Sequence, residues 1–178
     1  MAIEWPYIVE DNFLNKQHFD FLLKFYEQDI KDDSKGISKN KIWLDGNVEG
    51  KLNKKYLTTF YNDYSEKLAS YLKKLAPERI NSAKWLELNL VWSGKQYKHR
   101  IHEDSPNKLL SVVIYLHPEE SSGTFLYSDQ KGSDKTEVEW IKNRALIFAR
   151  QEGVTWHSYE GDGKSNRFAL VVNVRSDI

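Results

Sequence analysis

The 178-residue chain contains no cysteine. This absence excludes disulfide bonds, cysteine nucleophiles and thiolate metal ligands, so a bound metal must be held by His, Asp or Glu side chains. An excess of charge of either sign is also missing, because 26 basic residues balance 26 acidic ones. Without net charge the chain has no overall field for polyanions or anionic membranes, which disfavours nucleic acid and membranes as partners.

Long apolar runs are missing as well. No segment approaches the ~18 apolar residues needed to cross a bilayer, and the first residues, "MAIEWPYIVEDNFL", do not form a secretory signal. We therefore expect a cytoplasmic protein. The chain is nevertheless 40% hydrophobic and 13% aromatic, which is enough apolar material for a folded core. Its length predicts a single domain over residues 1–178.

Two segments in the first half of the chain predict helices. Apolar residues recur every three or four positions in residues 15–28, and more regularly in residues 53–76. Pro77 ends the second pattern, because proline cannot continue a helix. We expect these helices to cover one face of a sheet.

The segment between the predicted helices is polar. Residues 29–41 are rich in Gly, Ser and Lys and predict a loop, while Asp45-Gly46 predicts the tight turn of a small hairpin. Residues 1–82 are thus expected to form a mainly helical support. Whether residues 29–55 close over a site as a lid is left open.

From residue 83 onwards the pattern is that of β-strands. Turn-forming residues separate the runs "AKWLELNLVW", "KLLSVVIYLH", "GTFLYS", "TEVEW", "RALIFAR" and "NRFALVVNVR". Helices followed by six or more strands indicate an α+β fold, with a β-sandwich or barrel over residues 83–178.

The segment "HRIHEDSPNKLL" contains a candidate metal-binding pair. In extended backbone His102 and Asp104 point to the same side, where they can share one ion, although such a pair is also typical of a charged loop before a strand. We expect His99 on the opposite side, as a surface or rim residue. Further along, His157 ends a β-like segment, and the turn formers after it predict a hairpin that places it beside Arg167.

The last predicted strand carries a cation on its inner face. Alternation puts Arg167 on the same face as Ala169 and Val171, while the other face is apolar. A buried guanidinium requires an anionic partner. The same alternation turns Tyr115 inward in its own strand, so that a phenol and a guanidinium could clamp a bound carboxylate.

His102-x-Asp104, His157, and Arg167 ten residues later resemble the pattern of Fe(II)/2-oxoglutarate-dependent dioxygenases, in particular the prolyl 4-hydroxylase-like branch. The resemblance implies a double-stranded β-helix, the jelly-roll or cupin-like fold. It implies that His102, Asp104 and His157 hold Fe(II), with open positions for 2-oxoglutarate and O2. Arg167 and Tyr115 would bind the distal carboxylate of 2-oxoglutarate. The implied reaction hydroxylates a C–H bond and releases succinate and CO2, with ascorbate as a candidate reductant.

The resemblance also indicates a substrate class. Asp104 favours hydroxylation, because the related halogenases carry a small residue at this position. A prolyl residue in a peptide or protein is the first expected substrate, with Tyr97 and Lys108 contacting it at the mouth of the site. Asn173 departs from the aromatic that the family often has there. A free amino acid, another small molecule, an alkylated base, or a non-catalytic jelly-roll binding module therefore remain alternatives.

Overall fold

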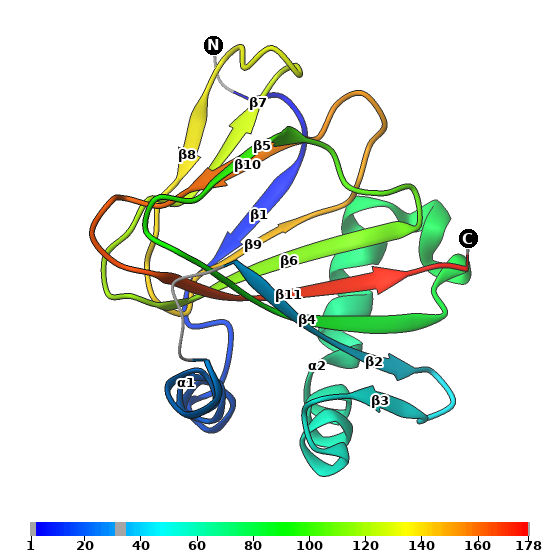
Figure 1. The fold of residues 1–178 in the computed structure, drawn as a ribbon. Helices are drawn as coiled ribbons and strands as arrows, with labels where there is room; N and C mark the ends of the chain where they lie inside the picture. The colour runs from blue at the N-terminus through cyan, green and yellow to red at the C-terminus, as the bar shows by residue number, and fades with distance from the viewer. Residues whose placement is uncertain (1–2, 31–34, 178) are drawn as a thin grey trace.

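The computed structural model describes residues 3–30 and 35–177. Over these residues the chain forms two antiparallel β-sheets that face each other, with helices on the outer side of the larger sheet (Figure 1). This is the expected α+β architecture with a jelly-roll core. No helix among the described residues has both the length and the apolar composition needed to cross a membrane.

The larger sheet has seven strands in the order β1-β9-β6-β11-β4-β2-β3. Its strands are β1 (Tyr7–Glu10), β2 (Gly36–Trp43), β3 (Val48–Gly50), β4 (Trp85–Ser93), β6 (Lys108–His117), β9 (Ala145–Phe148) and β11 (Arg167–Arg175). The smaller sheet has four strands in the order β5-β10-β7-β8. Its strands are β5 (Lys98–His102), β7 (Thr124–Tyr127), β8 (Thr136–Val138) and β10 (Trp156–Glu160).

Both predicted helices are present, as α1 (Lys16–Asp29) and α2 (Lys54–Leu75), and a short 3-10 helix, η1 (Pro77–Ser82), follows α2. Asn15 and Asn53 begin the two α-helices, because each side chain accepts a hydrogen bond from a backbone N–H three residues later. The apolar faces of the helices pack on the side of the larger sheet that carries the even-numbered residues of β4, β6 and β11. The core contains Leu22, Phe60, Leu68, Leu72, Leu88, Leu90, Val112, Ile114, Leu170 and Val172.

The prediction of a loop over residues 29–41 is wrong from Gly36 onwards. Residues 31–34 lie outside the described residues, but β2 pairs with β4 from Gly36 to Trp43. The pattern concealed a strand because two of its inward positions are polar: Ser38 and Asn40 are buried. The Asn40 amide donates to the Leu88 carbonyl and accepts from the Leu52 N–H, so the strand buries it without an unmet hydrogen bond.

The turn predicted at Asp45-Gly46 is confirmed. It joins β2 to β3, and Gly46 adopts a φ of 89°, in the left-handed region that favours glycine. The first 82 residues therefore contribute β1, β2 and β3 to the larger sheet, in addition to the helical support.

The predicted hairpin between His157 and Arg167 is wrong. β10 lies between β5 and β7 in the smaller sheet, whereas β11 lies between β6 and β4 in the larger one. Residues 161–166 therefore cross from one sheet to the other. Turn-forming residues suit both a hairpin within one sheet and a crossover between two sheets, so the sequence alone could not distinguish these connections. As a result, His157 and Arg167 belong to opposite walls of the sandwich.

Candidate metal centre

A cavity of about 180 Å³ opens between the two sheets. Much of its wall is apolar, with Val91, Val113, Phe148, Ala169 and Val171 facing the space. Polar side chains from both sheets complete the lining. An apolar cavity with a few converging polar groups is the usual form of a binding site for small molecules.

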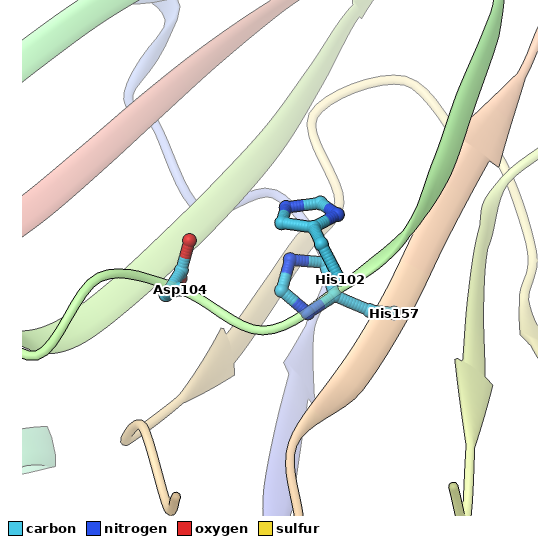
Figure 2. Close-up of side chains that lie close together, drawn as sticks. All are labelled: His102, Asp104 and His157. Carbon is cyan, nitrogen blue, oxygen red and sulfur yellow. The ribbon is translucent and has the colours of Figure 1, made fainter. Parts of the chain in front are cut away.

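Three of the predicted side chains come together in this cavity. His102 ends β5, Asp104 lies in the loop that follows, and His157 lies on β10 directly opposite His102 in the strand pairing. Ligand atoms of the three residues all lie within 4.8 Å of one another, and Figure 2 shows the two imidazoles with the carboxylate beside them. Asp104 and His157 are both buried. The spacing and the burial suit one metal ion.

Hydrogen bonds to the backbone orient both imidazoles. Nδ1 of His102 donates to the Arg100 carbonyl at 3.0 Å, and Nδ1 of His157 donates to the Thr155 carbonyl at 2.9 Å. With the proton on Nδ1, the lone pair of each neutral ring is on Nε2. Metal-binding histidines use this arrangement, in which the second nitrogen fixes the tautomer. The donor set therefore fits a divalent transition metal.

The Asp104 carboxylate is held by two donors. Ser111 Oγ donates to Oδ2 at 2.5 Å, and Lys108 Nζ donates to Oδ1 at 2.6 Å. Burial by itself raises the pKa of Asp104, but the His157 and Lys108 charges and these hydrogen bonds outweigh it and hold the pKa well below its usual range. Lys108, expected to contact substrate at the mouth, is thus paired with the candidate metal ligand.

Two arginines hold the loop that carries Asp104 in place: Arg150 is buried and Arg175 is half-buried. Arg150 Nε donates to the Asp104 carbonyl at 2.7 Å, and its Nη2 lies 3.2 Å from Glu103 Oε1. On the other side, Arg175 Nη1 donates to Asn107 Oδ1 at 2.7 Å. The loop geometry is therefore set by contacts with residues distant in sequence, which the spacing of His102 and Asp104 could not reveal.

His99 does not lie where the sequence predicted. Its ring lines the cavity and meets the His102 ring edge-on, with centroids 4.5 Å apart. The cause is an irregularity in the β5–β10 pairing between His157 and Tyr159, which breaks the strict alternation of side chains. His99 is nevertheless not part of the three-residue group that can hold a metal.

Burial, together with the charge of His157, lowers the pKa of His102 to about 4, and burial, together with the charge of His102, lowers that of His99 to about 4. Because the unfolded chain binds these protons below about pH 6.5, the metal-free protein should lose stability as the pH falls from 6.5 to 4. Allowing for partial solvent screening, we expect a loss of about 2 kcal/mol in the free energy of unfolding. Urea unfolding across this range measures it.

The double variant His99→Gln, His102→Gln serves as the control for this pH dependence. It should show a distinctly smaller loss of stability between pH 6.5 and pH 4. An unchanged slope in the double variant would assign the effect to other groups.

Arg167 faces the cavity from the larger sheet and is 5% exposed. Among the described residues no carboxylate lies within ion-pair distance of it, and its Nε has no hydrogen-bond partner. Its nearest contacts are a 3.5 Å approach to the Gly123 carbonyl and the rings of Trp140 and Tyr159. Burial lowers the pKa of this guanidinium. A buried cation without an anionic partner marks a site for an anionic ligand.

Tyr115 lies behind the cavity wall instead of in it. Its hydroxyl donates to Thr124 Oγ1 at 2.8 Å, and its ring stacks on Trp140 with centroids 4.5 Å apart. Thr124 lines the cavity in its place. Because Thr124 Oγ1 accepts the Tyr115 proton, its own proton is available to a ligand. Strand alternation predicted the direction of Tyr115, but not that a residue of the smaller sheet would cover it.

Of the comparisons with known proteins, only the one with solved structures gives matches, and these concern the fold. No family model matches the chain, and no curated protein matches its sequence. Among solved structures, a prolyl-4-hydroxylase from Pseudomonas putida aligns with a TM-score of 0.63 and 15% identity, covering 97% of this chain and 93% of that one. A Trichoplax adhaerens prolyl hydroxylase, in complex with a hypoxia inducible factor peptide fragment, aligns with a TM-score of 0.58 and 14% identity, covering 96% and 83%.

OsALKBH1 aligns with a TM-score of 0.55 and 11% identity, covering 99% of this chain and 100% of that one. These structures all have the fold of Fe(II)/2-oxoglutarate oxygenases, and the alignments extend over nearly the whole chain. The protein therefore has the jelly-roll fold of these oxygenases.

Proposed function

We propose that the protein is an Fe(II)- and 2-oxoglutarate-dependent dioxygenase that hydroxylates a C–H bond and releases succinate and CO2. One observation carries the proposal: a candidate metal group and a buried arginine without an acidic partner share one cavity. A metal site alone would suit many proteins. The added cation suits a dianionic cosubstrate bound beside the metal.

In this proposal His102, Asp104 and His157 hold Fe(II). Two imidazoles and one carboxylate form the donor set of non-haem iron oxygenases and leave positions open for further ligands. When bound, the iron supplies the oxidising chemistry with O2 and 2-oxoglutarate. The carbonyls of Arg100 and Thr155 keep both histidines in the metal-binding tautomer, and the apolar wall limits the access of water.

Arg167 binds the distal carboxylate of 2-oxoglutarate in the proposed complex. Its guanidinium offers paired donors that match the two carboxylate oxygens. Thr124 can add a hydroxyl donor, and Tyr115 acts through Thr124 by fixing the direction of that hydroxyl. Ascorbate is a candidate reductant, as for other enzymes of this kind.

A prolyl residue of a peptide or protein is the proposed first substrate. Two of the similar structures are prolyl hydroxylases, and one of these is bound to a peptide fragment. Retention of a carboxylate at Asp104 supports hydroxylation over halogenation.

Two experiments test this function. Fe(II) and 2-oxoglutarate are first added to the protein without oxygen, and a weak visible charge-transfer band is expected. Peptides that contain proline are then incubated with the loaded protein in air, and mass spectrometry should detect the gain of one oxygen atom together with succinate. A metal-loaded protein without the band would instead be a non-catalytic binding module.

Ser111 is expected to position Asp104 for the metal. Ser111→Ala removes the hydrogen bond to Oδ2 and should weaken metal binding by about tenfold, since such supporting contacts typically contribute ten- to a hundredfold. Ser111→Thr keeps the hydroxyl and should retain most of the affinity. Titration with Mn(II), followed by electron paramagnetic resonance, measures the change.

Ser38→Ala is the matched control. Ser38 is equally buried, but its Oγ has no hydrogen-bond partner among the described residues. Its replacement should leave Mn(II) affinity unchanged. Equal affinities of Ser111→Ala and the unmodified protein would show that Asp104 is oriented without Ser111.

A further inference from the structure

Four side chains from three segments meet at the mouth of the cavity: Lys35, Tyr97, His99 and Tyr159. Lys35 Nζ lies 2.6 Å from the Tyr97 hydroxyl, and this hydroxyl lies 2.9 Å from His99 Nδ1. The His99 ring also stacks on Tyr159, with centroids 5.0 Å apart. Lys35, His99 and Tyr159 line the cavity that contains the candidate metal ligands.

The chemistry of these groups sets the direction of their hydrogen bonds. An ammonium group can only donate, so Lys35 donates to the Tyr97 oxygen, and Tyr97 directs its own proton to Nδ1 of His99. A neutral His99 then carries its proton on Nε2. The His99 Nε2–H and the remaining N–H groups of Lys35 have no acceptor among the described residues, so they are free to serve a ligand.

The charges that line the cavity are unbalanced. Lys35, Lys108 and Arg167 are cationic, while Asp104 provides the one carboxylate among the described lining residues. Asp104 pairs with Lys108, and in the proposed complex one carboxylate of 2-oxoglutarate pairs with Arg167. Positive charge then remains at the metal and at Lys35. A cavity with such an excess attracts anions.

We propose that Lys35 and His99 form a carboxylate-binding subsite, so that the substrate carries a carboxylate close to the C–H bond that is hydroxylated. This inference rests on the proposed function and narrows its substrate class. One carboxylate oxygen accepts from His99 Nε2–H and the other from the Lys35 ammonium. Ile37 and Val91 line the cavity on neighbouring strands and provide an apolar surface for the hydrocarbon part. The carboxylate can belong to a free acid or to an acidic peptide side chain.

Matched probes test the subsite without turnover. The protein is loaded with Zn(II) in place of Fe(II) and with saturating 2-oxoglutarate, and both additions are measured by calorimetry before any probe is added. N-acetylproline is compared with N-acetylprolinamide, and the peptide Ac-Asp-Pro-Ala-NH2 with Ac-Asn-Pro-Ala-NH2. The carboxylate member of at least one pair should bind about tenfold more tightly. The pair that discriminates identifies the source of the carboxylate.

Variants assign the preference to residues. Lys35→Met should weaken binding of the carboxylate probe about tenfold and leave the amide probe unchanged. His99→Ala should act in the same direction, while His99→Gln, which keeps an N–H donor, should restore part of the binding. Lys39→Met is the control, because Lys39 is exposed on β2, the strand that follows Lys35, and does not line the cavity.

Three results would overturn the subsite. These are equal binding within both pairs, no binding of either carboxylate probe, and a preference that survives in Lys35→Met. Failure of the proposed function is a separate result, because it appears earlier as a loading step in which the metal or 2-oxoglutarate does not bind.

Discussion

Replacing His157 with alanine should abolish metal binding. His157 provides one of three candidate ligands, is buried, and is oriented through its Nδ1 bond to the Thr155 carbonyl. No other described His, Asp or Glu belongs to this group. Loss of one of three protein ligands should raise the Mn(II) dissociation constant by more than about a hundredfold, a larger effect than that of a supporting contact. Electron paramagnetic resonance measures it directly.

His117→Ala is the matched control for this substitution. His117 is a half-buried histidine at the end of β6, but it packs against Tyr26 and does not line the cavity. It should bind Mn(II) as the unmodified protein does. Circular dichroism melts of both variants separate loss of a ligand from loss of fold. A folded His157→Ala variant with unchanged metal affinity would contradict the assignment of the metal centre.

Much of the fold follows from side-chain alternation. The run "KLLSVVIYLH" coincides with β6, and the face assigned to Arg167 on β11 is the face that lines the cavity. Alternation is informative there because one face of each strand packs on the apolar core. It failed for β2, where Ser38 and Asn40 point inward. Hydrogen bonds satisfy the buried Asn40 amide, whereas Ser38 Oγ is buried without a partner among the described residues.

The candidate site was predicted less completely than the fold. Alternation indicated the His102–Asp104 pair, and the resemblance to Fe(II)/2-oxoglutarate-dependent dioxygenases added His157 to it, but three details of the site were not predicted. The irregular pairing of β5 turned His99 into the cavity, Thr124 covered Tyr115, and Lys108 turned to Asp104. The first two depend on which strand lies beside or opposite the residue, and residue spacing does not show this. The third joins residues only four apart, and the role expected for Lys108 at the mouth did not include it.

Arg167→Met should separate cosubstrate binding from metal binding and from stability. Without the guanidinium, the distal carboxylate of 2-oxoglutarate loses its charged partner, and truncation of such a buried pair typically costs about 2–5 kcal/mol. We therefore expect the dissociation constant for 2-oxoglutarate to rise by about a hundredfold. Mn(II) affinity should stay within about twofold, since Arg167 is not among the candidate ligands.

The same substitution should stabilise the ligand-free protein, because a buried cation without an anionic partner opposes folding. We expect the free energy of unfolding in urea to rise by about 1–2 kcal/mol. Arg150→Met is the control: Arg150 is equally buried but is paired with Glu103, so its loss should destabilise the fold. A stabilised Arg167→Met variant that still binds 2-oxoglutarate tightly would assign the carboxylate to another group. Loss of both Mn(II) and 2-oxoglutarate would instead make Arg167 part of the metal centre.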